Sequence, residues 1–293
     1  MFLFSLLLGG IVALYVGKVI IKPIQNIQNA FLEVSEGNFS IRVSENERID
    51  EIREMAKQFN AMTHDLSHIE TLRTDFVINV SHEFKTPISS IEGYATLLQN
   101  PSLSLEKRLY YTKKILENSN RLSTLTSNML LLCKLENQEM VIDKKLYRLD
   151  EQIRKVILFL EDKWTKKEIV LDLHLSSLMY YGSEKLLEQV WFNLIDNAIK
   201  FSPIGGKIKI QIKVTETSVF VQIEDHGKGM DEETIKHIFE KFYQGDSSRK
   251  EQGNGLGLAL VKRILNLCNG EISVQSILNQ GSTFSVCLPI LKH

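Results

Sequence analysis

The chain opens on an uninterrupted apolar stretch. From Phe2 to Ile21 the only charged side chain is Lys18, and these twenty residues are about enough to cross a hydrocarbon core roughly 30 Å thick. The pattern predicts one transmembrane helix within residues 1–21. A signal peptide is the alternative, but no basic segment precedes the run and no small-residue cleavage site follows it. Lys18 and Lys22 lie at its C-terminal end, which places the following chain in the cytoplasm.

Short stripes with heptad spacing come next. Two predicted helices carry apolar residues in steps of three and four, and an extended connector with alternating apolar residues lies between them. The three sets are Ile24, Ile27, Phe31 and Val34, then Phe39, Ile41 and Val43, then Ile52, Met55, Phe59, Met62 and Leu66. Because short heptad helices cannot bury their stripes alone, we expect them to pair with a second copy of the chain.

A longer helical pattern follows, with the apolar stripe continuing from Ile69 to Leu98. Its phase changes near Ile69, which over- or unwinds a supercoil locally. Asn100-Pro101-Ser102 ends the helix, and a leucine-rich stripe between Leu109 and Leu132 predicts a return helix. Two such helical hairpins make a four-helix bundle.

Beyond a linker at residues 137–145 the pattern alternates between helices and strands. Helices are predicted near residues 150–163 and 183–201, and strands near residues 169–175, 207–214, 218–225, 271–275 and 283–288. This pattern is typical of an α/β sandwich with helices packed on one sheet. The expected fold class is therefore a membrane-anchored multidomain chain with one transmembrane helix, an all-α dimeric region and an α/β domain.

Composition narrows the classes of function. With 293 residues, 43% of them hydrophobic, the chain can form more than one cored domain. A net charge of −1 from 35 basic and 36 acidic residues gives no reason to expect nucleic acid as a partner. Three separated cysteines suggest neither a disulfide framework nor a zinc site.

The first candidate for chemistry is the stretch VSHEFKTPI, residues 80–88. His82 lies about 200° round the helix from the core positions Val80 and Phe84, so its imidazole is predicted to face water. Glu83 is adjacent, Thr86 is one turn on, and Pro87 cannot donate to the carbonyl of Glu83. An exposed histidine is usually inert, but a neighbouring carboxylate and an interrupted helix make it a candidate nucleophile.

The second candidate is the stretch QVWFNLIDNAIKF, where Gln189, Asn193, Asn197 and Lys200 form one polar stripe. Carboxamide oxygens are ligands suited to Mg²⁺, and a lysine on the same face suits phosphate. An ordinary amphipathic helix with its polar face in water explains the stripe equally well.

The third candidate is rich in glycine. Asp225 shares a strand face with Val219, Val221 and Ile223, so its carboxylate is expected to be buried and to accept from a donor such as an adenine amine. Gly227 and Gly229 follow at once, and Gly253, Gly255 and Gly257 precede an apolar helix whose N-terminus favours phosphate. Phe239, Phe242 and Tyr243 lie between the clusters, as anchors of a lid or as the foot of a surface loop.

These stretches resemble, in kind and in order, the sequence boxes of the bacterial two-component sensor histidine kinases. The boxes are the histidine box at His82, the asparagine box at Asn193 and Asn197, the DxGxG box at Asp225, the FxxF box at Phe239, the GxGxG box at Gly253 and the stretch Gly281-Ser282-Thr283. The resemblance implies a HAMP linker at residues 22–69, a dimerisation and phosphotransfer hairpin at residues 70–137, and a GHKL (Bergerat-fold) ATP-binding domain at residues 138–293. Arg53 stands where the HAMP family usually has glycine.

The resemblance also implies roles for single residues. His82 would take the γ-phosphoryl group of ATP, Glu83 would hold the proton of the other imidazole nitrogen, and Thr86 would orient water when a regulator is dephosphorylated. The implied cofactors are ATP and Mg²⁺, with Asn193 as the metal ligand. The implied nucleotide-binding residues are Asn193, Asn197, Lys200, Asp225, Gly227, Gly229, Phe242, Gly253, Gly255, Gly257 and Thr283. The implied partners are a second copy of the chain, a cognate response regulator that receives the phosphoryl group on an aspartate, and the bacterial cell membrane.

The sequence predicts a single membrane span and no extracellular sensor domain, whereas most members of the family are expected to have two spans that flank a sensor. We therefore expect a truncated form, or a protein that senses within the membrane or through partners. Two other hypotheses remain: a nucleotide-binding scaffold or regulator phosphatase with little kinase activity, and a GHKL ATPase whose turnover does not depend on His82.

Overall fold

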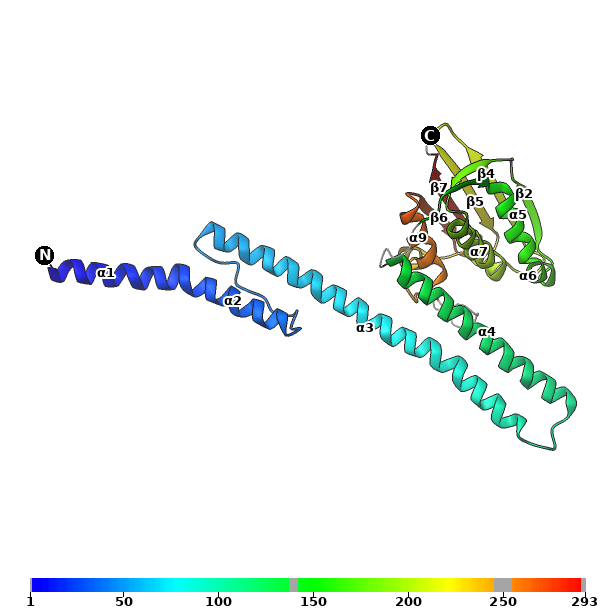
Figure 1. Ribbon diagram of the computed structural model, residues 1–293, viewed down its shortest axis with the longest axis horizontal. Coiled ribbons are helices and arrows are strands. Elements are labelled where there is room, and N and C mark those ends of the chain that lie inside the picture. Colours follow the sequence, from blue (N-terminus) through cyan, green and yellow to red (C-terminus); the bar gives the residue numbers. More distant parts are fainter. Residues whose placement is uncertain (1, 137–141, 245–254, 291–293) are drawn as a thin grey trace. The chain divides into compact units, whose positions relative to one another are not determined.

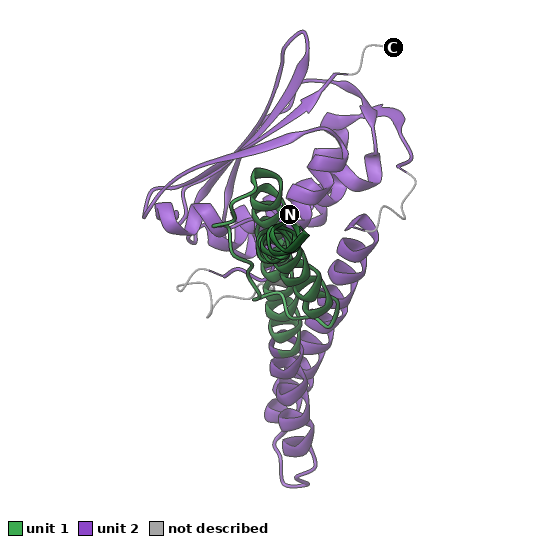
Figure 2. Ribbon diagram, turned by 90° about the vertical axis from the view of Figure 1, so that its left-hand side faces the viewer, with its two compact units in different colours: residues 1–81 green, residues 82–293 purple. Residues whose placement is uncertain are grey.

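The computed structural model describes residues 2–136, 142–244 and 255–290. The chain divides into two compact units, residues 1–81 and 82–293 (Figure 2). One long helix, α3 (Asp50–Leu98), belongs to both units.

The first unit begins with one continuous helical stretch. This stretch consists of α1 (Phe2–Val16), a π-helical turn (Gly17–Ile21) and α2 (Lys22–Ser35). In the π turn the backbone N–H of Lys22 donates to the carbonyl of Gly17, immediately before Pro23. None of the side chains of α1 is buried. Within the described residues, Phe2–Ser35 is the helical stretch with the length and apolar composition to cross a membrane.

The α2 helix packs against the start of α3 within one chain. Ile27 and Ala30 are buried with Ile52, Ala56 and Phe59, and the rings of Phe31 and Phe59 meet edge to face at 4.9 Å. The two apolar stripes are therefore buried in part against each other within one chain, and not only against a second copy as the sequence predicts. Large apolar residues of the predicted stripes remain exposed, namely Ile24, Phe31, Met55 and Met62.

The connector between α2 and α3 is fastened to α3 by two polar side chains. The carboxamide of Asn60 pairs with both backbone groups of Val43, at 2.9 Å each, and Arg42 donates to the hydroxyl of the buried Thr63 at 3.0 Å. Phe39, Ile41 and Val43 are half-buried and alternate with exposed residues, as the sequence predicts.

The helical hairpin consists of the second half of α3 and of α4 (Leu105–Glu136) (Figure 1). The predicted break at residues 100–102 is confirmed, because α3 ends at Leu98 and α4 begins at Leu105. Pro87 is buried inside α3, and the helix continues through it. Many large apolar side chains of the hairpin are exposed in the single chain, among them Ile88, Leu97, Leu109, Leu116 and Leu130.

The α/β domain contains a five-stranded sheet in the order β2-β4-β5-β7-β6. The pair β2–β4 is parallel and the other pairs are antiparallel. The strands are β2 (Val170–His174), β4 (Lys207–Val214), β5 (Ser218–Asp225), β6 (Glu271–Ile277) and β7 (Gly281–Pro289), so all five predicted strands are confirmed. Two short strands that the sequence did not predict, β1 (Lys145–Arg148) and β3 (Met179–Gly182), form a separate antiparallel pair.

Helices α5 (Leu149–Phe159), α7 (Glu184–Phe201) and α9 (Gly257–Leu267) cover one face of the large sheet (Figure 1). Short helices α6 (Glu161–Lys166) and α8 (Glu232–His237) complete the domain. The core between the layers holds fully buried side chains from both, including Leu187, Trp191, Leu194, Ile208, Ile210 and Ile223. The result is the two-layer α/β sandwich that the sequence predicts.

Candidate functional site

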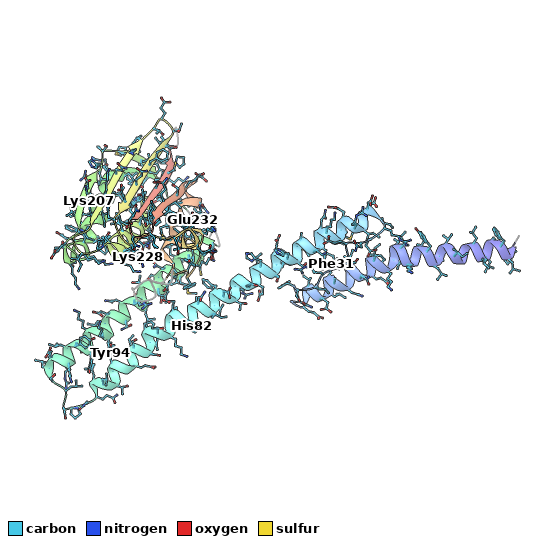
Figure 3. All side chains as sticks on the ribbon, turned by 180° about the vertical axis from the view of Figure 1, so that it is seen from behind. Phe31, His82, Tyr94, Lys207, Lys228 and Glu232 are labelled. Atoms are coloured by element: carbon cyan, nitrogen blue, oxygen red, sulfur yellow. The ribbon has the colours of Figure 1, made fainter. Side chains whose placement is uncertain are left out.

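His82 lies within α3 with its side chain exposed, as the helical phase predicts (Figure 3). Its ring makes no hydrogen bond or ion pair with any other residue that the structure describes. The hydroxyl of Thr86 donates to the backbone carbonyl of His82 at 3.2 Å. This bond lies beside Pro87, whose missing N–H leaves the carbonyl of Glu83 without its helical donor.

Glu83 makes its described contacts with residues other than His82, although the two residues are adjacent in sequence. Its Oε2 accepts from Nη2 of Arg121 on α4 at 3.0 Å, and its Oε1 accepts from Nε2 of Gln244 at 3.2 Å. Adjacent residues of a helix do not face each other directly, which accounts for the absence of a hydrogen bond between the Glu83 carboxylate and the imidazole among the described contacts. The structure thus joins Glu83 to groups from two other parts of the chain, and sequence reasoning found neither Arg121 nor Gln244.

The polar stripe of α7 is arranged around the start of α9. Asn193 is buried, its amide nitrogen donates to the carbonyl of Gln189 at 2.8 Å, and a Cβ added at Gly257 would lie 2.8 Å from its Oδ1. Asn197 and Lys200 are half-buried further along the same helix. The carboxamide oxygen of Asn193 is therefore the group that this side chain presents to the N-terminus of α9.

Two lysines lie against one aromatic ring at the end of α7. The Nζ of Lys200 is 4.4 Å from the centre of the Phe201 ring, and the Nζ of Lys228 is 4.5 Å from the same centre. Lys228 lies between the two glycines that follow Asp225 (Figure 3). Sequence reasoning passed over Lys228, because it lies in a loop, outside the periodic patterns of helices and strands.

Asp225 ends β5 with its carboxylate buried, as strand alternation predicts. Its Oδ1 accepts from the backbone N–H of Gly227 at 2.8 Å, and the backbone of Ser282 donates to it as well. Burial raises the pKa of Asp225 to about 6, and the two backbone donors oppose that rise. The site holds a carboxylate that a further hydrogen-bond donor would stabilise.

The backbone around Asp225 requires glycine at close approaches. A Cβ at Gly227 would lie 2.5 Å from the carbonyl oxygen of Phe201, so this loop packs directly on the end of α7. Gly229 has φ +62°, a conformation that favours glycine. Ser276 fixes the next residue, because its hydroxyl accepts from the N–H of Met230 at 2.8 Å and donates to the carbonyl of Gly281 at 3.0 Å.

The second glycine cluster meets an aromatic residue in an unusual conformation. Phe242 has φ +62°, and its N–H donates to the carbonyl of Gly255 at 2.8 Å. Gly255 has φ +63°, and a Cβ there would lie 2.6 Å from the backbone of Phe242. Gly253 lies outside the described residues, as does the part of the predicted lid at residues 245–252.

The last predicted box is placed differently from the others. Ser282 pairs directly with Asp225 across the β5–β7 ladder, whereas Thr283 pairs with Glu224. Because successive side chains of a strand point to opposite faces, Thr283 lies on the other face of the sheet from Asp225. The structure thus brings Asn193 close to Gly257, Asp225 close to Gly227 and Gly255 close to Phe242, whereas Thr283 lies on the opposite face of the sheet from Asp225.

The donor set fits Mg²⁺ held together with phosphate better than a metal bound by protein alone. No group of three or more His, Cys, Asp or Glu side chains within the described ranges could hold a metal ion. Mg²⁺ in nucleotide sites commonly takes one or two protein oxygens, and phosphates and water supply the rest. The oxygen of Asn193, directed at Gly257, fits that pattern.

Three domain families match the chain. Residues 15–68 match the HAMP domain, residues 72–138 the His Kinase A (phospho-acceptor) domain, and residues 182–292 the ATPase of histidine kinases, DNA gyrase B and HSP90. His82, on the exposed side of the hairpin, falls within the phospho-acceptor match, and the site around Asp225 falls within the ATPase match. With these domains in this order, the chain belongs to the two-component sensor histidine kinases.

Curated relatives carry the name heme sensor protein HssS. The chain is 36% identical to that of Staphylococcus saprophyticus over 267 residues, which is 91% of this chain and 57% of the relative. It is 32% identical to that of Staphylococcus aureus over 275 residues, 94% of this chain and 59% of the relative. The chain therefore spans about three fifths of the length of these relatives, whose name describes the whole proteins.

Solved structures of histidine kinases share the fold. The histidine kinase AdeS of Acinetobacter baumannii has a TM-score of 0.61 and 28% identity, covering 72% of this chain and 98% of AdeS. Histidine kinase ThkA, solved with the response regulator protein TrrA, has a TM-score of 0.61 and 25% identity, covering 77% of this chain and 64% of the matched chain.

Proposed function

We propose that the chain is an ATP-dependent protein-histidine kinase that phosphorylates His82 and passes the phosphoryl group to an aspartate of a response regulator. The observation that carries the proposal is an exposed imidazole in the phospho-acceptor hairpin, without a hydrogen bond or ion pair to any described residue, in a chain that also holds a buried carboxylate at the start of a glycine loop. Phosphoryl transfer needs mainly positioning and charge stabilisation, and both kinds of group are present.

Each end of the nucleotide has a group suited to it. Asp225 would accept a hydrogen bond from the exocyclic amine of adenine, because its buried carboxylate accepts from two backbone N–H groups and a carboxylate has about four acceptor sites. Asn193 would hold Mg²⁺, and Asn197 and Lys200 would contact phosphate oxygens. The bound Mg²⁺ supplies positive charge for the phosphates. The glycines let the backbone approach the nucleotide closely.

The partners follow from the same proposal. The exposed apolar side chains of the hairpin suit a second copy of the chain, and the solved complex of ThkA with TrrA supports a response regulator as the acceptor. The N-terminal helical stretch would anchor the chain in a bacterial membrane, with Lys18 and Lys22 on the cytoplasmic side.

The test uses the full chain in detergent micelles or nanodiscs with labelled ATP and Mg²⁺. We expect acid-labile label on the wild type and none on His82→Gln or after chelation of Mg²⁺. Label that survives His82→Gln would overturn the proposal, and ATP turnover without any label would favour a simple ATPase.

A second activity, dephosphorylation of the regulator, is favoured by the position of Thr86, whose hydroxyl lies one turn from His82. In the same assay Thr86→Ala should keep autophosphorylation and slow the loss of phosphate from a phosphorylated regulator. Equal rates for the variant and the wild type would remove Thr86 from that role.

A further inference from the structure

The carboxylate beside the phospho-acceptor histidine is tied to the other helix of the hairpin. Glu83 and Arg121 form an ion pair at 3.0 Å, with 20% and 28% of their side chains exposed. Thirty-eight residues separate the two in sequence, and the pair crosses from α3 to α4. Arg121 therefore fixes a group that the sequence alone associates with His82.

The surroundings of Arg121 are not those of a pair arranged for stability alone. Its Nε is buried without a hydrogen-bond partner among the described residues, while its Nη2 reaches Glu83. A guanidinium has five donors, and two of them can meet a carboxylate side by side. Here the contact is through one nitrogen, so part of the donor capacity of Arg121 is left unused. Buried N–H groups without partners are uncommon in folded proteins and call for an explanation.

We propose that Arg121 is a positioning residue for autophosphorylation that acts through Glu83. The inference rests on the proposed kinase function. In that reaction a lone pair of one imidazole nitrogen of His82 attacks the γ-phosphorus of ATP. The bond from this phosphorus to the bridging oxygen breaks, and its electrons leave with ADP. The proton on the other imidazole nitrogen passes to the Glu83 carboxylate.

Arg121 contributes by holding the Glu83 carboxylate, the proton acceptor, in a fixed position. The imidazole is exposed and without a described partner, so it can turn about its side-chain bonds. The carboxylate is held against α4, so the mobile ring meets a base whose position is already fixed. Holding a catalytic group in place saves orientational freedom that would otherwise be lost in the transition state.

The experiment measures the initial rate of acid-labile label against ATP concentration, with the full chain in nanodiscs. Arg121→Ala should lower kcat by about tenfold and leave the KM for ATP unchanged, a smaller loss than the roughly 10²- to 10⁴-fold of general acid–base catalysis because the Glu83 carboxylate itself remains. Arg121→Lys, which keeps the charge but not the planar donors, should recover part of the rate. Arg121→Met, which keeps length without charge, should behave like Arg121→Ala.

A double-mutant cycle separates action through Glu83 from a general structural role. In a Glu83→Gln background, Arg121→Ala should have no further effect on the residual rate. The matched control is Lys114→Ala, which removes another ion pair of α4, that with Glu117 at 2.8 Å, and should leave the kinetics unchanged.

The outcomes distinguish this inference from the proposed function. An equal loss from Arg121→Ala in both backgrounds, a change confined to the KM for ATP, or full activity of Arg121→Met would overturn the inference alone. Absence of label on the wild type would overturn the kinase function and the inference with it.

Discussion

At the scale of single residues, the burial of Asp225 lowers the stability of the protein when its carboxylate is ionised. Its carboxylate is 6% exposed and its pKa is raised to about 6, so the native state without nucleotide holds it at a cost when it is ionised. A bound adenine amine would supply the missing donor. If Asp225 binds adenine as proposed, its carboxylate is better suited to the liganded state than to the free one, which is common for binding sites.

The raised pKa gives a testable dependence of stability on pH. Between the unfolded value near 3.8 and the folded value of about 6, the native state binds the proton more tightly, so the free energy of unfolding falls as pH rises through this window. Asp225→Asn should remove this decrease in the free energy of unfolding with rising pH. At pH 7.5 the variant should be more stable than the wild type by up to about 3 kcal/mol, from a shift of roughly two pH units.

The measurement is urea unfolding followed by tryptophan fluorescence, because both tryptophans, Trp164 and Trp191, lie in the α/β domain. Asp172→Asn is the control, since Lys207 lowers the pKa of Asp172. The ion pair of Asp172 with Lys207 stabilises the native state above the unfolded pKa of Asp172, and this stabilisation is lost as pH falls. Asp172→Asn should therefore lower the free energy of unfolding at pH 7.5, whereas Asp225→Asn should raise it. A wild-type curve parallel to that of Asp225→Asn would refute the assignment.

The sequence correctly predicts the burial or exposure of a site residue where the periodicity of its own helix or strand determines it. The exposure of His82 follows from helical phase and the burial of Asp225 from strand alternation, and both are confirmed. Arg121 and Ser276 could not be found this way, because their contacts join residues far apart in the chain. Ser276, for example, contacts Met230 across 46 residues.

At the scale of elements, the end of α7 is secured by one lysine from outside the helix. The Nζ of Lys167 donates to the carbonyls of Ile199, Lys200 and Ser202 at 3.0, 2.6 and 2.9 Å. These carbonyls have no helical partners, and a cation at a helix C-terminus is favourable. Asn197, Lys200 and the Phe201 carbonyl that meets Gly227 all lie on this last stretch.

Lys167→Met should therefore weaken both the fold and the nucleotide site. We expect a loss of about 2 kcal/mol in the free energy of unfolding, because three carbonyls lose a charged donor. We also expect weaker ATP binding, measured by titration of the folded protein at low temperature. Lys166→Met, at the neighbouring exposed lysine, is the control. Unchanged ATP affinity in a destabilised Lys167→Met would limit Lys167 to a structural role.

The elements that the sequence missed are short. The four-residue strands β1 and β3 have too little alternation to be recognised, and their pairing joins segments more than thirty residues apart. The helix predicted at residues 150–163 is divided at Leu160, where φ −94° and ψ +12° end α5 before α6 begins. Apolar periodicity continues across such a break, so periodicity alone cannot detect it.

At the scale of the whole molecule, the exposed apolar surface of the hairpin supports a dimer. Leu109 and Leu116 on α4 are 63% and 59% exposed in the single chain. Large apolar side chains in such number along one hairpin are expected to be covered by another chain. Two hairpins together would form the four-helix bundle that the sequence predicts.

The dimer can be tested by mass. Light scattering in nanodiscs or detergent, corrected for lipid and detergent, should give twice the 33.6 kDa of one chain. Leu109→Glu combined with Leu116→Glu should shift the mass toward one chain, because carboxylates would replace apolar contacts. Leu158→Glu is the control, since Leu158 is equally exposed, at 63%, but lies on α5. A dimer that survives the double substitution and dissociates with Leu158→Glu would place the interface elsewhere.

The continuity of α3 makes the number of its residues matter as well as their identity. The helix is unbroken from the clamp at Asn60 and Thr63 to His82. Each inserted residue would turn everything downstream by about 100°, so two would bring the histidine to the opposite side, whereas seven would return it to within about 20° of its original direction. Side chains on the exposed side of this stretch can thus be exchanged one at a time, but residues can be added without reorienting His82 only in multiples of about two helical turns.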